Sequence, residues 1–277
     1  MQLNGRVGAI TGAASGIGRA LACQLAARGM DLALSDVDEA GLAETVDLAK
    51  VAGAGATITS QRLDVADREA VHAWADRVVT DHGRANLIVN NAGVAVVSTI
   101  DGMSYDDFDW LMDINFHGVV SGTRAFLPHL KAAGEGHVVN ISSVFGLMGI
   151  PSQSAYNAAK FAVRGFTEAL RVELDMERCG VSASTVHPGG IKTNIARSAR
   201  MDGVEAALGR PAAEVHEGFD RAARTTPAEA AEIIIKGIEE NRRRILVGAD
   251  ARVISLLSKL PPGAYQGLLA KGASLRR

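Results

Sequence analysis

A tyrosine and a lysine stand four positions apart in the segment SAYNAAK, residues 154–160. Four residues make about one helical turn, so on a helix Tyr156 and Lys160 would lie on the same face. Lowering the pKa of a tyrosine from about 10 to near 7 requires about 4 kcal/mol in favour of the phenolate. One ammonium group at about 4 Å supplies energy of that order at an effective dielectric constant of 20. The pair is a candidate general acid and base, although the spacing is also typical of a packed tyrosine beside a lysine that reaches solvent.

The composition is that of an ordinary globular protein. The 277 residues are 47% hydrophobic and 22% charged, and the net charge of -2 excludes the basic footprint of a nucleic-acid-binding domain. Cys23 and Cys179 are far apart and indicate neither a disulfide framework nor a metal site. The N-terminal segment lacks the features of a signal peptide, and no long apolar run is present. We therefore expect a cytoplasmic protein.

Short apolar segments alternate with longer amphipathic segments along the chain. Several apolar segments are hydrophobic throughout, which is typical of strands covered on both faces. The alternation predicts an α/β fold, a single Rossmann-like doubly wound parallel sheet of about seven strands with helices on both faces. The expected strands are 6–10, 31–35, 56–65, 86–90, 137–142, 181–187 and 244–248, and the expected helices include 38–52, 67–82, 106–131 and 153–178. A capping box in TPAE, residues 226–229, predicts the start of a further helix.

The glycine-rich segment TGAASGIG, residues 11–18, joins the first expected strand to the first expected helix. Gly12 permits a tight turn, while Gly16 and Gly18 let the backbone approach a ligand and the helix pack on the sheet. The N–H groups at a helix N-terminus bind pyrophosphate well. A plain strand–helix turn has a similar composition, but the position at the first strand–helix junction favours dinucleotide binding.

Asp36 ends the second expected strand, 18 residues after Gly18. A carboxylate at this position can accept hydrogen bonds from the ribose hydroxyls of the cofactor. It would repel a 2′-phosphate, because two unit charges 4 Å apart are worth on the order of 4 kcal/mol at an effective dielectric constant of 20. The residue therefore favours NAD over NADP. The alternative is that Asp36 caps the following helix, a role that Ser35 or Asp38 could also fill.

Taken together, the motifs resemble those of the short-chain dehydrogenase/reductase family, over about residues 1–250. Ser15 stands where extended, epimerase-type relatives would have a glycine, so the resemblance is to the compact members. The motifs occur in the family's order, as TGAASGIG (11–18), LDV (63–65), NNAG (90–93), INFHG (114–118), NISS (140–143), YNAAK (156–160) and HPGGIKT (187–193).

The resemblance implies a catalytic tetrad of Asn115, Ser143, Tyr156 and Lys160. Tyr156 would exchange a proton with a secondary alcohol or ketone as hydride passes to or from NAD, and Ser143 would bind the substrate oxygen. Lys160 would lower the pKa of Tyr156 and bind the nicotinamide ribose, and Asn115 would anchor a water molecule. The implied cofactor-binding residues are Gly12, Ser15, Gly16, Ile17, Gly18, Asp36, Asp64, Val65, Asn91, Ala92, Gly93, Tyr156, Lys160, Pro188, Gly189, Ile191 and Thr193. The implied substrate-binding residues are Ser143, Phe145, Tyr156 and Gly190.

The segments around this site predict a neutral, fairly apolar substrate. Neither 93–98 nor 144–153 contains a lysine or an arginine that could bind an acid group. Segment 194–225 has no strand pattern and is longer than most connections, so we expect a lid. Arg197, Arg200 and Arg210 in this segment leave open an anionic group farther out on the substrate.

Residues 251–277 form a basic amphipathic extension beyond the dehydrogenase domain at 1–250. Val253, Leu256, Leu257 and Leu260 recur at helical spacing and predict one apolar helix face. Three placements are open. The extension could pack on the body or on another subunit, which we favour, close over the substrate cleft, or rest on an anionic membrane.

Two inferences concern assembly and function. The resemblance implies a homodimer or homotetramer that pairs through the helices expected at 106–131 and 153–178. Two other functions on the same fold stay open, namely a non-catalytic dinucleotide-binding sensor or scaffold, and an isomerase or dehydratase.

Overall fold

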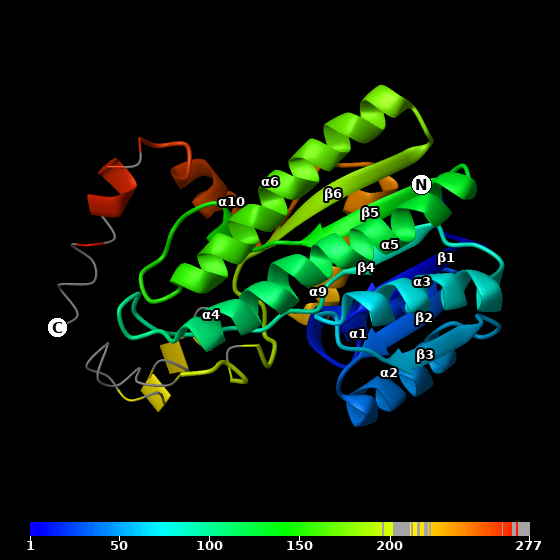
Figure 1. Ribbon diagram of the computed structural model, residues 1–277, viewed down its shortest axis with the longest axis horizontal. Coiled ribbons are helices and arrows are strands. Elements are labelled where there is room, and N and C mark those ends of the chain that lie inside the picture. The colour runs from blue at the N-terminus through cyan, green and yellow to red at the C-terminus, as the bar shows by residue number, and fades with distance from the viewer. Residues whose placement is uncertain are drawn as a thin grey trace.

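Seven parallel strands form one sheet in the order β3-β2-β1-β4-β5-β6-β7 (Figure 1). The computed structural model describes residues 1–195, 197–201, 211, 213–214, 217–218, 221, 223–261, 263–267 and 270. Every strand expected from the sequence is present, which confirms the predicted α/β fold. The strands are β1 (Val7–Thr11), β2 (Asp31–Asp36), β3 (Ile58–Arg62), β4 (Leu87–Asn90), β5 (Gly136–Ile141), β6 (Val181–Pro188) and β7 (Arg244–Val247).

Helices cover both faces of this sheet (Figure 1). Successive strand residues point to opposite faces, so Ile10 packs with one helical layer and Ala9 with the other. The first layer consists of α1 (Gly16–Ala26), α2 (Glu39–Ala52) and α9 (Pro227–Glu239). The second layer consists of α3 (Arg68–His82), α5 (Gly118–Ala132) and α6 (Ser154–Glu177). The predicted capping box at the start of α9 is confirmed.

The strand order reverses between β1 and β4, because the chain builds β2 and β3 on one side before it returns to β4 on the other. In such sheets ligands bind at the carboxyl ends of the strands, beside this reversal. Most motifs of the predicted site lie at or just after one of these carboxyl ends. They include the glycine-rich segment after β1, Asp36 on β2, Asp64 after β3, Asn91 after β4, Ser143 after β5 and Pro188 on β6.

The helix expected at 106–131 is divided into three parts, which corrects the prediction of a single helix. It consists of α4 (Tyr105–Met112), the π-helical turn η1 (Asp113–His117) and α5. A π turn inserts one extra residue without ending the helix, and such turns are frequent at functional sites. The apolar periodicity continues through it, so the sequence pattern did not reveal the change.

The extension begins with α10 (Ala249–Leu257), which follows β7 directly, so the predicted boundary at residue 250 falls inside a helix. Its apolar face does not pack on the body, because Val253 and Leu256 are 58% and 68% exposed while Ala251 and Ser255 are buried. Packing on another subunit, the other half of the favoured placement, stays a prediction. Small side chains let this helix approach the sheet closely. Leu268 and Leu269 lie outside the described residues. None of the described helices combines the length and apolar content needed to cross a bilayer.

Two isolated bridges bracket the expected lid, segment 194–225. Val96 pairs with Arg200, and Ile191 pairs with Thr225. Much of the segment between them, including Leu208, Arg210 and Phe219, lies outside the described residues, so its role as a lid stays a prediction.

Candidate active site

Tyr156 and Lys160 lie close together at the start of α6, as their spacing predicts. The Lys160 Nζ atom is 5.4 Å from the centroid of the Tyr156 ring. Lys160 is buried, and its Nζ donates a hydrogen bond of 3.0 Å to the carbonyl oxygen of Ile141, the last residue of β5. Tyr156 is half-buried, and its ring packs edge-on against Phe145. The two side chains are therefore held by different elements, and the phenol faces the end of β5.

Ser143 is held from two sides at the start of the short 3₁₀ helix η2 (Val144–Gly146). Its hydroxyl oxygen accepts a hydrogen bond from the N–H of Phe145 at 3.1 Å, and its side chain also hydrogen-bonds Tyr156. Its carbonyl oxygen is 2.9 Å from the Nδ1 atom of the buried His187. Because a carbonyl only accepts, Nδ1 of His187 must carry the proton. Ser143 and Tyr156 thus form one unit whose backbone is fixed by β6.

Asn115 lies fully buried within the π turn η1. Its Oδ1 accepts from the N–H of Val94, and its Nδ2 donates to the carbonyl oxygen of Val94, both at 2.8 Å. A Cβ atom at Gly93 would lie 3.1 Å from the Asn115 Oδ1 and 3.6 Å from the Lys160 Nζ. The structure therefore brings Asn115 and Lys160 together around Gly93. The predicted water site has the second lone pair of the Asn115 Oδ1 as an available acceptor.

Burial dominates the acid–base properties of this pair. It raises the pKa of Tyr156 to about 12, against the lowering effect of the hydrogen bond with Ser143. It lowers the pKa of Lys160 to about 8. The prediction that Lys160 alone brings the Tyr156 pKa near 7 is thus wrong for the protein chain by itself. The electrostatic argument counted the attraction of the ammonium but not the cost of removing the phenolate from water.

The glycine-rich turn leaves the N-terminus of α1 open to a ligand. Gly12 and Gly16 have positive φ angles of 65° and 54°, which residues with a side chain rarely adopt, and a side chain at Gly18 would overlap the carbonyl oxygen of Gly12.

The start of α1 has no side-chain cap. Ser15 is the N-cap residue but makes no capping hydrogen bond, and the first turn contains no acidic residue. Ile17 points back into the core. By contrast, α2, α3, α4 and α9 each have a capping side chain and an acid in the first turn. The N-terminal amides of α1 thus fit a pyrophosphate.

The segment after β4 locks this turn in place. Asn91 donates from its Nδ2 to the carbonyl oxygens of Thr11 and Gly12, at 3.0 and 2.9 Å. The Thr11 hydroxyl in turn accepts from the N–H groups of Asn91 and Ala92. A Cβ atom at Gly12 would come within 2.7 Å of the Ala92 Cα. These hydrogen bonds therefore join the ends of β1 and β4, the two strands between which the strand order reverses, at the glycine-rich turn.

Asp36 faces the glycine-rich turn and does not cap α2. Its Oδ2 accepts from the N–H of Ala14 at 2.9 Å, and its Oδ1 accepts from the N–H of Asp38 at 3.0 Å. The cap of α2 is Asp38, whose Oδ1 accepts from the N–H of Gly41. The alternative that Asp36 is the helix cap is therefore wrong.

Asp64 and Val65 follow β3 at the same edge of the sheet. The Oδ1 of Asp64 accepts from the N–H of Ala66 at 2.9 Å, which folds this short loop on itself. Val65 is buried, and a Cβ atom at Gly118 would lie 2.8 Å from its Cγ2. The glycine lets α5 approach this loop closely, so both residues are held at the edge where the resemblance places the adenine.

The loop after β6 closes the other side of the site. Pro188 ends β6, and Ile191 pairs with Thr225 in an isolated bridge. The Thr193 methyl carbon would lie 3.0 Å from a Cβ atom at Gly16. The loop thus reaches the glycine-rich turn, so expected binding residues for the two ends of a dinucleotide lie close together.

The comparisons agree with this geometry. The sequence model of the family described as short chain dehydrogenase matches residues 6–203. The chain belongs to the short-chain dehydrogenase family. It is 49% identical over 271 residues to SadH of Mycobacterium tuberculosis, named as an oxidoreductase, covering 98% of this chain and 96% of that protein. It is 34% identical over 215 residues to a 3-alpha-(or 20-beta)-hydroxysteroid dehydrogenase of Mycobacterium bovis, covering 77% and 80% of the two chains.

Among solved structures, it is similar to a short-chain dehydrogenase/reductase of Burkholderia phymatum in complex with NAD. The sequence identity is 35%, the TM-score is 0.82, and the alignment covers 91% of this chain and 93% of that one. This short-chain dehydrogenase is accordingly an oxidoreductase that uses a nicotinamide dinucleotide and acts on small-molecule substrates.

The residues after Ser143 divide between the core and the surface of the dehydrogenase. Leu147 and Met148 are buried. Phe145 and Ile150 are half-buried, and Phe145 contacts the Tyr156 ring. Phe145 thus contacts the ring of the predicted base, and Tyr156 also packs against a cluster that includes Val96 of segment 93–98.

Arg200 is committed to a structural contact. Its guanidinium carbon lies 3.5 Å from the centroid of the Trp110 ring, and its Nη1 is 2.8 Å from the Asp107 Oδ1. Its backbone makes two hydrogen bonds with segment 95–97. The N–H of Arg200 donates to the carbonyl oxygen of Ala95, and the N–H of Val97 donates to the carbonyl oxygen of Arg200. Arg200 therefore holds the start of the expected lid against α4, and its charge is already paired.

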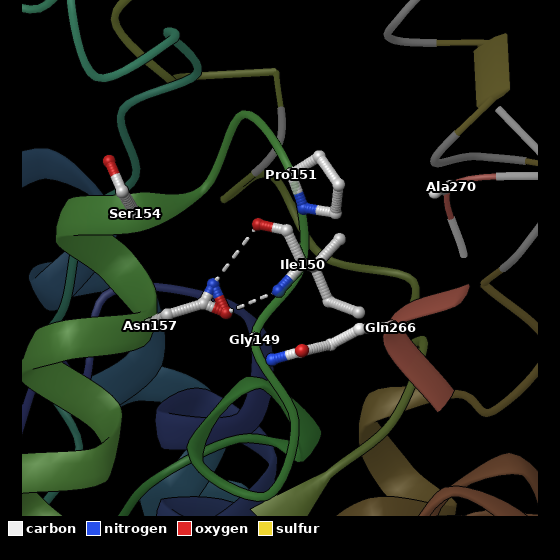
Figure 2. Close-up of a pocket in the computed structure, with 7 residues that line it drawn as sticks. All are labelled: Gly149, Ile150, Pro151, Ser154, Asn157, Gln266 and Ala270. Carbon is white, nitrogen blue, oxygen red and sulfur yellow. Dashed lines mark hydrogen bonds between the residues drawn. The ribbon is translucent and has the colours of Figure 1, made fainter. Parts of the chain in front are cut away.

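A pocket of about 310 Å³ separates the extension from the loop at residues 149–151 (Figure 2). Asn157, next to Tyr156 on α6, accepts from the N–H of Ile150 at 2.9 Å and donates to its carbonyl oxygen at 3.4 Å, as Figure 2 shows. Gln266 and Ala270 of the extension line the opposite side. The extension of the dehydrogenase therefore lies beside the loop that follows Ser143.

Two residues that sequence reasoning missed contact this site. His187 contacts the carbonyl oxygen of Ser143 through its Nδ1 atom. The motif HPGGIKT that contains it was noted only for the family resemblance and for its cofactor-binding residues. Asp250 contacts the loop after β6 from α10. Asp250 lies 60 residues farther along the chain than Gly190, so no local sequence pattern indicated this contact.

Proposed function

We propose that this short-chain dehydrogenase transfers a hydride between NAD and a secondary alcohol or the corresponding ketone, and that Tyr156 is the general acid and base. The observation that carries the proposal is the assembly of Ser143, Tyr156 and Lys160 beside an uncapped helix N-terminus. A cofactor bound there in its oxidised form would supply the hydride acceptor and a positive charge.

The side chains have separate tasks in this proposal. Ser143 accepts a hydrogen bond from the N–H of Phe145, so its own proton can point to the substrate oxygen or to Tyr156. In alcohol oxidation Tyr156 takes the hydroxyl proton, and in ketone reduction it returns that proton to the oxygen. Lys160 lies beside the Tyr156 ring as a buried cation. Its charge favours the phenolate form of Tyr156 once the cost of burying that phenolate is offset.

Asp36 supports NAD as the cofactor. One of its carboxylate oxygens accepts the N–H of Ala14 in the glycine-rich turn and the other accepts the N–H of Asp38. Its negative charge is therefore held beside that turn, where the ribose of the adenosine would bind. A 2′-phosphate at that position would face this charge.

A neutral, apolar substrate is supported by the surroundings of Tyr156. Phe145 contacts its ring, and Arg200 is paired with Asp107 instead of being available for an acid group. The hydroxysteroid dehydrogenase among the relatives is named for a substrate of this kind.

Homo-oligomerisation in the cytoplasm is the remaining part of the proposal. Along α6, Phe161, Val172 and Met176 are 40%, 53% and 78% exposed, which is a large apolar area for an isolated chain. Neither Cys23 nor Cys179 is in a disulfide, which suits a reducing compartment.

A substrate panel tests the proposed function. Purified protein is assayed with steroid, fatty, terpenoid and small aliphatic alcohols and ketones, each with both forms of the cofactor. We expect NAD(H)-dependent turnover of neutral, apolar members. NADH binding without turnover of any member would favour the sensor or scaffold function, and a cofactor that cycles without net consumption would favour an isomerase or dehydratase.

A further inference from the structure

We propose that Asp250 is a positioning residue that fixes the loop at 188–193 for cofactor binding, so that the C-terminal helix α10 forms part of the active site. The inference rests on the proposed function, in which this loop holds the nicotinamide end of the cofactor. The carboxylate Oδ2 of Asp250 accepts a hydrogen bond of 2.6 Å from the N–H of Gly190. This N–H belongs to the turn that directly follows β6.

Two glycines make room for the Asp250 carboxylate. A side chain at Gly189 would overlap it, and a Cβ atom at Gly248 would lie 2.5 Å from its Oδ1. Gly248 has a φ angle of 98°, which few other residues adopt. The carboxylate therefore occupies a close-fitting notch between the end of β6 and the start of α10.

The contact is not an ordinary helix cap. Gly248 is the N-cap residue of α10, and the helix start has no side-chain capping hydrogen bond. Elsewhere in the chain Asp38 and Asp67 cap their own helices. Asp250 also lies in the first turn of its helix, yet its carboxylate reaches away from that helix to a loop 60 residues earlier in the chain.

Backbone groups make other hydrogen bonds of this loop. Gly189 donates its N–H to Val247, and the carbonyl oxygen of Gly190 accepts from the N–H groups of Arg224 and Thr225. Asp250 thus adds a side-chain contact to a turn that segment 224–225 holds through its backbone. If it is removed, the Gly190 N–H loses a charged acceptor, and hydrogen bonds to charged groups are among the stronger ones in proteins.

Release of this turn would move the residues that the proposal assigns to the nicotinamide. Ile191 and Thr193 follow Gly190 immediately, and Thr193 reaches the position of Gly16 in the glycine-rich turn. α10 also packs against η2, which follows Ser143. In Figure 1, α10 lies at the same end of the molecule as the start of α6. The helix therefore contacts both the loop after β6 and η2, which carries the Phe145 ring that packs on Tyr156.

The test compares three variants of the full chain by two measurements. Asp250→Ala removes the contact, Asp250→Asn keeps an acceptor oxygen without the charge, and Asp250→Glu keeps the charge but moves it by one methylene group. Arg252→Ala, on the exposed side of the same helix, is the control. Hydrogen–deuterium exchange of peptides covering 188–193 is measured without cofactor, and NADH binding is measured by fluorescence titration.

We expect Asp250→Ala and Asp250→Glu to exchange about tenfold faster in this loop and to bind NADH about tenfold more weakly than the wild type, because one charge-assisted hydrogen bond is lost. Asp250→Asn should stay within about threefold of the wild type in both, since the acceptor remains. The control should match the wild type.

Wild-type exchange in Asp250→Ala, or wild-type behaviour of Asp250→Glu, would overturn the inference. The second result would mean that only a negative charge at the start of α10 matters. If the wild type itself binds no NADH, the proposed function fails and the cofactor part of the inference fails with it. The exchange rates still decide whether Asp250 holds the loop.

Discussion

At the scale of single residues, Tyr156 shows how burial and charge oppose each other in this site. Burial raises the pKa of its phenol to about 12 and lowers that of the neighbouring Lys160 ammonium to about 8. Each pKa unit corresponds to about 1.4 kcal/mol, so bringing the phenol from about 12 to near neutrality takes several kcal/mol. In the proposed mechanism, base catalysis near neutral pH would draw on the ammonium of Lys160 and on the further positive charge that comes with the oxidised cofactor.

Replacement of the phenol tests its role directly. Tyr156→Phe removes the hydroxyl and keeps the ring contact with Phe145. We expect turnover to fall at least about hundredfold, because general acid–base catalysis contributes factors of that order. NADH binding should stay within a few-fold. Steady-state absorbance assays and a fluorescence titration measure the two effects, and more than a tenth of wild-type turnover would refute Tyr156 as the base.

The buried His187 predicts a specific dependence of stability on pH. Burial lowers its pKa from 6.5 to about 4, so the unfolded chain binds the proton more readily between these values. Stability is complete above about pH 6.5 and is lost as the pH falls toward 4, by about 2 kcal/mol between pH 7 and 5. His137, whose pKa burial lowers to about 3, adds to this loss.

His187→Asn should reduce that loss by about 2 kcal/mol, because asparagine keeps a donor for the Ser143 carbonyl but does not titrate. Urea unfolding of both proteins at the two pH values measures the difference. Equal losses in the two proteins would show that His187 does not contribute.

At the scale of elements, the strands were predictable and the helical detail around the site was not. Several strands are apolar throughout, and amphipathic segments separate the strands, which is a local signal. The π turn that carries Asn115 has no such signal, because its extra residue leaves the apolar periodicity of 106–131 continuous. The contacts of His187 and Asp250 join segments 44 and 60 residues apart, and no local pattern encodes such a pairing.

The uncapped start of α1 gives a prediction in which stability and binding change in opposite directions. Ser15→Asp places a capping acid where the helix has none. The free energy of unfolding should rise by about 0.5–1 kcal/mol, because the carboxylate can cap the helix and its negative charge interacts favourably with the helix dipole. NADH binding should weaken at least tenfold, since a pyrophosphate would meet the same charge. Chemical denaturation and titration measure both, with Ser15→Ala as the control without charge, and unchanged NADH binding would contradict a pyrophosphate site there.

At the scale of the whole molecule, the sheet places its chemistry at one edge and leaves apolar area elsewhere. The exposed Val172 and Met176 lie on the second half of α6, away from Tyr156 at its start. The apolar side chains of α10, Val253 and Leu256, form a separate exposed group. The sequence pattern identified both helices as amphipathic, but it could not tell which apolar residues the chain itself covers, because that depends on how closely small residues such as Ala251 let a helix approach.

Charge substitutions on these two helices distinguish which surface joins subunits. We expect Val172→Glu with Met176→Glu to shift the molar mass measured by light scattering from an oligomer to 28.9 kDa, the mass of one chain, because a carboxylate buried without a partner opposes association. Val253→Glu with Leu256→Glu is the matched pair on α10 and should keep the oligomer. The reverse outcome would assign the interface to the extension. A wild-type mass of one chain would mean that neither face is an interface between copies in solution.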